Sequence, residues 1–321
     1  MCMLGEEALG YGMITGKGRP LPSFPPDPLA STCSPFAMAL AALPRDVQRV
    51  IFAQLCNPLD PGVAVAFGSA SSELWELTQA PRQQLQADHK AATALGRKAG
   101  KRSCKVLRVA IEVLWSNTGR SSADFALLGT LGSVLPALEG LRLNEPAAGP
   151  DGVQRLAEKL GAGAQPAVIW LELSDTHVGD TGASALAAAL GRGALPRLKF
   201  LELDNTALGD AGLMALAPAL SRLPALENLR LSRNPLGDDG LAALVAPPPP
   251  AGAPLPTTGG LATLKTLFLN YTQITDAGCA ALAAALDSGA LPALERLCLL
   301  DTPASAAAKT TVRRAGLEVV M

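Results

Sequence analysis

The sequence repeats itself over more than half of its length. Five segments of one pattern follow each other, and a sixth fades before the chain ends. Their starts lie 30, 30, 28, 38 and 30 residues apart, and they span residues 138–160, 168–190, 198–220, 226–246, 264–286 and 294–316. Self-similarity at this period is typical of architectures in which structural units stack on their neighbours.

Each repeat combines two periodicities. The shared template is L-x-x-L-x-L-x-x-(N/T)-x-L-x-x-x-G-x-x-x-L-x-x-x-L. Alternation every two residues predicts a short strand in the first part, and leucines four residues apart predict a helix in the second. One strand–turn–helix unit cannot bury its apolar side alone. Stacked units therefore predict an α/β solenoid, with a parallel sheet on the concave face and helices on the convex face.

The repeats resemble leucine-rich repeats of the ribonuclease-inhibitor type, over roughly residues 138–316. In that family an asparagine after the strand bonds backbone groups where the chain leaves the strand. Here the position holds Asn234 once and threonine four times, at Thr176, Thr206, Thr272 and Thr302. A hydroxyl both donates and accepts, so threonine can make some of these bonds. We therefore expect a partial ladder, meaning a row of side-chain hydrogen bonds that runs from repeat to repeat along the ends of the strands. Pro146 occupies the position in the first repeat and predicts no such bond there.

An aspartate and a glycine mark the start of most predicted helices, as in the motif Gly-Asp-Thr-Gly at 179–182. We expect each aspartate to cap its own helix, and each glycine to let helix and strand approach closely. The aspartates are Asp180, Asp210, Asp238 and Asp276, and the glycines are Gly152, Gly182, Gly212, Gly240 and Gly278. Because this motif recurs, it indicates a helix start and no phosphate loop. The nearby His177 lies at a position that varies between repeats, so it indicates no metal site.

Composition divides the chain into three parts. Residues 1–37 are rich in Pro, Gly and Ser and are predicted to be disordered. Residues 38–108 form a helical segment, and residues 109–321 form the solenoid. The solenoid begins with a degenerate repeat at Ala110–Leu135, and a proline-rich insertion at 247–260 explains the 38-residue spacing.

The helical segment resembles an F-box. It has a Leu-Pro opening, an Ile-Phe pair in the following helix and a Pro-Leu-Asp turn. The resemblance implies docking to the adaptor of a cullin-type ubiquitin ligase through Pro44, Ile51, Phe52 and Leu59. The family's cysteine–basic–x–tryptophan segment is absent, since the chain reads FGSASSELWEL there. The alternative is a plain helical cap on the solenoid.

The sequence contains no recognisable catalytic motif. The motifs G-x-x-x-x-G-K-[ST], H-E-x-x-H and G-x-S-x-G are all missing, so we expect no enzyme, cofactor or metal. The net charge of −1 favours neither nucleic acid nor an anionic membrane. The longest apolar run, Phe36–Leu43, is far shorter than the roughly 20 residues that span a bilayer.

The compartment follows from the same features. The N-terminus lacks the pattern of a signal peptide, and the six cysteines are scattered, which favours reduced intracellular thiols. We therefore expect a cytoplasmic or nuclear protein. A basic run at His89–Arg108 is read as a solvated helix face, with a nuclear-import signal or an acidic partner as the alternative.

The exposed strand positions predict a protein-binding concave face. Aromatic residues make up only 4% of the chain, yet four of them fall at these positions beside charged residues. The predicted residues are Trp170, Glu172, Asp175, Phe200, Glu202, Asp204, Arg230, Arg233, Phe268 and Tyr271. The alternative for Trp170 and Phe200 is a cross-strand pair that packs within the sheet. Other functions left open are a regulator of small GTPases, by resemblance to the GTPase-activating protein of Ran, and a structural scaffold.

Overall fold

The solenoid predicted from the repeats is confirmed. The computed structural model describes residues 39–40, 42–98, 107–161, 165–246, 261–313 and 316–321. In these residues eight parallel strands form one sheet, in chain order from β1 to β8. The tail at 1–37, the basic residues Lys101, Arg102 and Lys105, and the insertion at 247–260 lie outside the described residues.

Each strand pairs in parallel with the strand of the next repeat. β1 lies in the stretch read as a degenerate first repeat, and β8 follows the sixth repeat, where the template predicts nothing. The strands are β1 (Glu112–Ser116), β2 (Gly140–Asn144), β3 (Trp170–Glu172), β4 (Phe200–Glu202), β5 (Asn228–Arg230), β6 (Thr266–Phe268), β7 (Arg296–Cys298) and β8 (Glu318–Val320).

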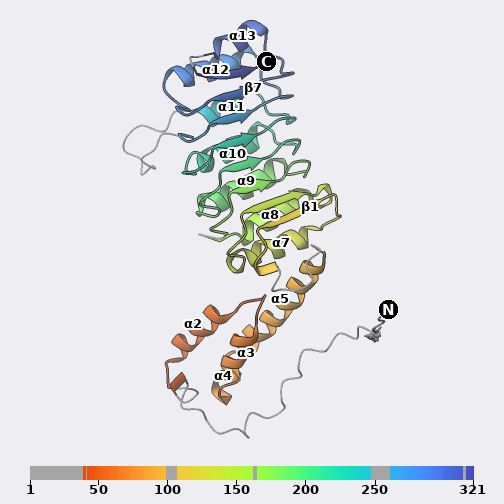
Figure 1. Ribbon diagram of the computed structural model, residues 1–321, viewed down its shortest axis with the longest axis vertical. Helices are drawn as coiled ribbons and strands as arrows, with labels where there is room; N and C mark the ends of the chain where they lie inside the picture. The colour runs from red at the N-terminus through yellow and green to blue at the C-terminus, as the bar shows by residue number, and fades with distance from the viewer. Residues whose placement is uncertain (1–38, 41, 99–106, 162–164, 247–260, 314–315) are drawn as a thin grey trace, which may run out of the picture.

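The helices that connect the strands lie along one side of the stack, and the sheet lies along the other (Figure 1). They are α7 (Ser122–Thr130), α8 (Gly149–Lys159), α9 (Gly179–Gly191), α10 (Asp210–Leu220), α11 (Asp238–Val245), α12 (Asp276–Asp287) and α13 (Ala306–Thr311), with short 3-10 turns η2 (Leu131–Val134) and η3 (Pro146–Ala148). Helix α11 has 8 residues where α12 has 12, because the proline run begins at Pro247 and proline cannot continue a helix.

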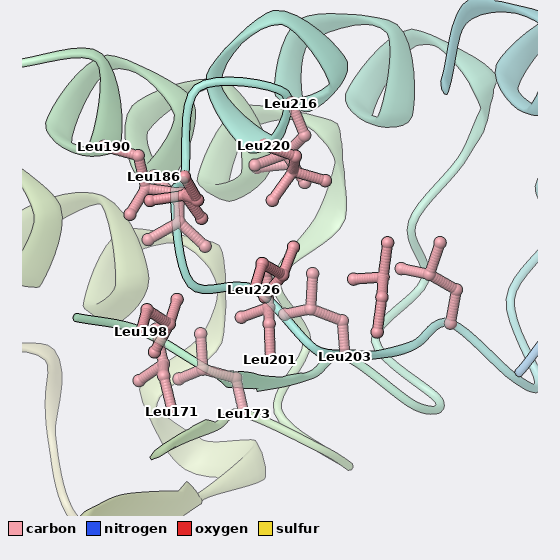
Figure 2. Close-up of a cluster of buried hydrophobic side chains, with 14 of the residues drawn as sticks. Leu171, Leu173, Leu186, Leu190, Leu198, Leu201, Leu203, Leu216, Leu220 and Leu226 are labelled. Carbon is pink, nitrogen blue, oxygen red and sulfur yellow. The ribbon is translucent and has the colours of Figure 1, made fainter. Parts of the chain in front are cut away.

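Leucines from both layers meet between the sheet and the helices. Figure 2 shows Leu186 and Leu190 of α9 and Leu216 and Leu220 of α10 above the strand leucines, which include Leu171 and Leu201. All of these side chains are buried. In each repeat of the stack, which we call a rung, alternate strand residues and helix residues four apart thus point into the core. The template predicts this arrangement. Cys279 of α12 is also fully buried, at the position that Leu213 and Leu241 occupy in their repeats.

The ladder after the strands is partial, as expected. Asn234 bonds backbone groups of its own rung and of the preceding rung. Thr176 also reaches the preceding rung, donating to the carbonyl of Leu143 (2.6 Å) and accepting from the N–H of Glu145 (2.8 Å). The other three threonines donate to a carbonyl three residues earlier in their own rungs: Thr206, Thr272 and Thr302.

In the rung of Pro146 a buried carboxylate replaces the ladder residue. Glu145 is fully buried, and its carboxylate accepts the backbone N–H groups of Thr118 (2.8 Å), Gly119 (2.9 Å) and Arg120 (3.3 Å). It also accepts the hydroxyl of Thr118. The turn after β1 is therefore held by the next rung although proline removes the usual donor.

The helix-start aspartates cap the next helix, not their own. Asp180 of α9 accepts the N–H groups of Gly209 (2.8 Å) and Gly212 (3.0 Å) at the start of α10. Asp210 repeats this at α11, and Asp238 and Asp276 accept backbone N–H groups at the starts of α12 and α13. The expectation of capping within a repeat is thus wrong. The carboxylates link consecutive repeats.

The recurring glycines make room for these carboxylates. A Cβ on Gly240 would lie 2.6 Å from Asp210 Oδ1 and 3.2 Å from Asp210 Cα, too close for a side chain. Gly182 provides a comparison, because Pro150 stands in the preceding repeat where the others have aspartate. Its nearest neighbours are valine side chains, at 3.0 Å or more. The glycines therefore permit close helix–helix contact rather than the helix–strand contact expected from the sequence.

Among the described residues, helices α2 to α5 precede the sheet and extend from one end of the solenoid (Figure 1). They are α2 (Arg45–Leu55), α3 (Gly62–Gly68), α4 (Ser72–Leu77) and α5 (Gln79–Lys98). Phe52, Phe67, Leu74 and Leu85 form a small core among them, separate from the solenoid core. Further along α5, Leu95 belongs to the solenoid core, so this helix joins the two.

Two of the four residues implied by the F-box resemblance are buried. Phe52 is 2% exposed, with its ring centroid 6.2 Å from that of Phe67, and Leu59 is 4% exposed in the solenoid core. Neither side chain is accessible to an adaptor in this structure. Pro44 is exposed at the start of α2, and Ile51 is half-buried against the small core.

Candidate functional site

The ten residues predicted for the concave face lie on one face of the solenoid. Residues that flank the buried strand leucines form columns across the sheet, because strand side chains alternate. One column runs Trp170, Phe200, Asn228, Thr266, and the next runs Glu172, Glu202, Arg230, Phe268. The other four predicted residues follow the strands: Asp175, Asp204, Arg233 and Tyr271.

Trp170 and Phe200 stack on each other across β3 and β4. Their ring centroids are 4.9 Å apart, with an angle of 27° between the ring planes. The guanidinium of Arg142 lies over the Trp170 ring, 4.6 Å from its centroid. The rings therefore form the cross-strand pair considered as the alternative, and yet both remain half-buried on the concave face.

Arg230 contacts the carboxylates that lie next to the Trp170–Phe200 pair. Its Nε and Nη2 atoms each lie 2.7 Å from Asp204 Oδ2, and Glu202 lies farther away, at 3.7 Å. The same guanidinium covers the Phe268 ring at 4.9 Å. Asp204 is further satisfied by the N–H of Ser232 at 2.7 Å. One arginine of β5 thus contacts side chains on both sides, in the repeats of β4 and β6.

The other carboxylates on this face have no cation as close as Arg230 is to Asp204. Glu172 accepts from the Asn144 amide at 2.7 Å, and Arg142 Nε is 3.6 Å away. Asp175 accepts from the Asn205 amide at 2.8 Å. Burial raises the pKa of Glu202, opposed by Arg230 and reinforced by the negative charges of Glu172 and Asp204. The surface therefore carries more negative charge than its own cations neutralise.

The residues at the strand ends adopt left-handed backbone conformations. The φ angles are 60° at Asp175, 53° at Asn205, 60° at Arg233 and 56° at Tyr271. Asn and Asp tolerate this conformation, whereas Arg and Tyr gain nothing local from it. The guanidinium of Arg233 lies 5.5 Å from the centre of the Tyr271 ring. Both side chains project from the rim as an exposed pair.

A polar hollow of about 390 Å³ lies in the middle of this face. Seven of the ten predicted residues line it. The lining also includes small polar residues that follow the strands and that the sequence analysis did not single out. The lining residues are Asn144, Glu172, Ser174, Asp175, Glu202, Asp204, Asn205, Arg230, Ser232, Arg233, Asn270 and Tyr271.

The structure adds an exposed residue in the first rung. Leu114 of β1 pairs with Arg142 in the column of Glu172 and is an exposed large hydrophobic residue. The sequence did not indicate it because the first repeat departs from the template. Its place in the column follows from the pairing of β1 with β2.

Neither a metal cluster nor a membrane span is found in the part of the chain that the structure describes. No group of three or more His, Cys, Asp or Glu residues there could hold a metal ion. None of the described helices combines the length and apolar character needed to cross a bilayer. His177 is exposed at the edge of its rung.

Comparison with known proteins identifies the repeat. The family model described as Leucine Rich repeat matches residues 171–187, 195–217, 224–245 and 260–283. No curated protein matches the chain.

Three solved structures are among those that match the chain. A Bacteroides fragilis protein is 14% identical, with 71% of this chain and 68% of that chain covered and a TM-score of 0.42. The yeast complex of Rad7 and Elc1 matches at 14% identity, 62% and 64% coverage and a TM-score of 0.24. An internalin of Listeria monocytogenes matches at 12% identity, 73% and 94% coverage and a TM-score of 0.26.

Proposed function

We propose that this leucine-rich-repeat protein binds another protein on the concave face of its solenoid. The observation that carries the proposal is the half-exposed Trp170–Phe200 stack beside a charged hollow on one continuous face. Aromatic anchors next to charged groups are typical of the residues that dominate binding energy at protein interfaces. The leucine core and the side-chain hydrogen bonds between repeats supply most of the stability, so the exposure of these rings and charges is not needed for folding.

The rim supports the same proposal. A left-handed conformation costs a non-glycine residue roughly 1 kcal/mol, least for Asn and Asp. Asn117 and Asn205 occupy this position in two rungs, whereas Arg233 and Tyr271 occupy it in two others. Large exposed side chains at a strained position are explained if they contact a partner.

A photo-crosslinking experiment tests this face. We expect p-benzoylphenylalanine at Tyr271 to crosslink a specific protein in cells, which mass spectrometry then identifies and which binds the purified chain. Met214 on α10 is the matched control, because it is 52% exposed on the convex side and Tyr271 is 50% exposed on the concave side. Equal crosslinking of the same proteins from both positions would contradict a concave binding site.

We also propose that the N-terminal helices contact a ubiquitin-ligase adaptor, which would make the chain a substrate receptor. The observation in favour is an apolar surface on α2, where Val47 and Val50 are 38% and 60% exposed near the exposed Pro44. This surface differs from the one implied by the F-box resemblance, because Phe52 and Leu59 are buried.

The adaptor proposal is tested by changing that surface alone. Val47→Asp with Val50→Asp is expected to abolish co-purification of the adaptor and to leave the thermal unfolding temperature nearly unchanged, since both side chains are exposed. Val63→Asp, at another exposed valine on α3, is the control. If the wild-type chain retains no cullin adaptor, the receptor role is wrong and the concave-face proposal is unaffected.

A further inference from the structure

We propose that the hollow on the concave face receives an arginine side chain of the protein partner. This inference rests on the proposed function and names the chemical group that the same surface recognises. It is carried by the charge of the hollow, by buried hydroxyl groups without partners, and by the geometry of the acceptors.

The hollow is negatively charged. Four carboxylates and two guanidinium groups line it, which leaves a net charge of −2 at neutral pH. Arg230 is bound to Asp204, and Arg233 lies against the Tyr271 ring at the rim. Neither guanidinium is therefore placed to neutralise Asp175, and Glu172 has only the distant Arg142, at 3.6 Å. A cation from outside would be attracted to these carboxylates.

Two hydroxyl groups in the hollow lack hydrogen-bond partners. Ser174 is 9% exposed and Ser232 is 6% exposed, and neither Oγ atom bonds any of the described residues. The side-chain oxygen of Asn144 is likewise unpartnered. Buried polar atoms without partners are unfavourable and uncommon in folded proteins. A bound group that donates several hydrogen bonds would satisfy all three.

A guanidinium fits these acceptors better than the other cations. It offers five N–H donors in a planar fork, whereas an ammonium offers three from a single point. The acceptors come from different rungs and are spread over carboxylate, hydroxyl and amide oxygens. A divalent metal is disfavoured, because no metal-holding cluster exists among the described residues.

The test uses short peptides, so it does not depend on knowing the partner. The ¹⁵N-labelled full chain is titrated with acetyl-Gly-Arg-Gly-amide, and the same peptide with citrulline or lysine in place of arginine provides the comparison. We expect the arginine peptide to shift the backbone amide signals of Ser174, Asn205 and Ser232 in a saturable way. Citrulline has nearly the same shape without the charge, so the citrulline peptide should bind at least about tenfold more weakly in the same titration.

Two variants link the shifts to the hollow. Glu202→Gln with Asp175→Asn is expected to weaken arginine-peptide binding about tenfold, and Ser232→Ala to weaken it about threefold. Asp239→Asn changes the charge on an exposed position of α11 and should leave binding unchanged. Binding that citrulline or lysine matches, or that Asp239→Asn weakens equally, would overturn the proposal.

The two proposals fail in different ways. If Tyr271 crosslinks a partner whose binding does not respond to Glu202→Gln with Asp175→Asn, the arginine site is wrong and the concave face remains the binding surface. If no partner is crosslinked and the arginine peptide still binds, the proposed protein-binding function fails alone.

Discussion

Asn234→Ala is expected to lower the free energy of unfolding by about 3 kcal/mol, more than any other single change in the ladder. The Asn234 side chain is buried and accepts the N–H groups of Thr206 and Leu208, both at 3.0 Å. Its amide donates to the carbonyls of Leu203 (2.7 Å) and Leu231 (3.0 Å). Alanine would leave two backbone donors buried without partners, and each such loss is worth roughly 1–3 kcal/mol.

Matched variants separate the ladder from the loss of any buried polar side chain. Thr272→Ala removes one hydroxyl that bonds only within its own rung, so we expect a loss of about 1 kcal/mol. Asn234→Thr should fall between the two, because threonine occupies this position in four other repeats. Urea unfolding followed by circular dichroism measures all three. Equal losses for Asn234→Ala and Thr272→Ala would show that the contact between rungs adds nothing.

The placement of side chains within a rung could be predicted because it depends on local periodicity. Alternation around Leu171 and Leu201 sets which residues face the helices, and the constant repeat length sets which residues pair across strands. The columns that contain Trp170, Phe200, Glu172 and Glu202 follow from these two facts alone. The same reasoning gives the stacking of the two rings only as an alternative, because rotamers depend on neighbouring side chains.

Contacts between rungs were predicted less well. Asp210 and Gly240 are 30 residues apart in the sequence, and each looks like a local helix-start residue in its own repeat. Only the stacked structure shows that one caps the helix that contains the other. Glu145 is similar: it lies in a solvent-facing register by sequence, but the turn after β1 surrounds its carboxylate with N–H donors.

The N-terminal helices show another limit of sequence patterns. Val47, Val50, Ile51 and Leu55 have helical spacing and suggest a buried face, yet the structure buries Gln48 and Phe52 of α2 and exposes Val47 and Val50. A helix of 11 residues with apolar side chains on most of its circumference does not specify which stripe packs inward. Packing against α3 and α4 decides this, as the contact of Phe52 with Phe67 of α3 shows.

Trp170→Ala is expected to weaken binding of the concave-face partner by about 30- to 1000-fold, which corresponds to about 2–4 kcal/mol. A large half-exposed ring between Arg142 and Phe200 is already held in place, so little conformational entropy is lost when a partner covers it. Truncation removes the contact area and also frees Phe200 and Arg142 to move. Both effects lower the affinity.

The fold should survive this substitution, since the Trp170 ring lies outside the leucine core. Loss of the stack is worth about 0.5–1.5 kcal/mol of stability, well below the effect of Asn234→Ala. Thr266→Ala, at a half-buried position in the same column, should change the affinity less than about threefold. Surface plasmon resonance with the partner crosslinked at Tyr271 measures both variants. If Trp170→Ala behaves like Thr266→Ala, the stack is a structural cross-strand pair, and binding must depend on the charged hollow and the rim instead.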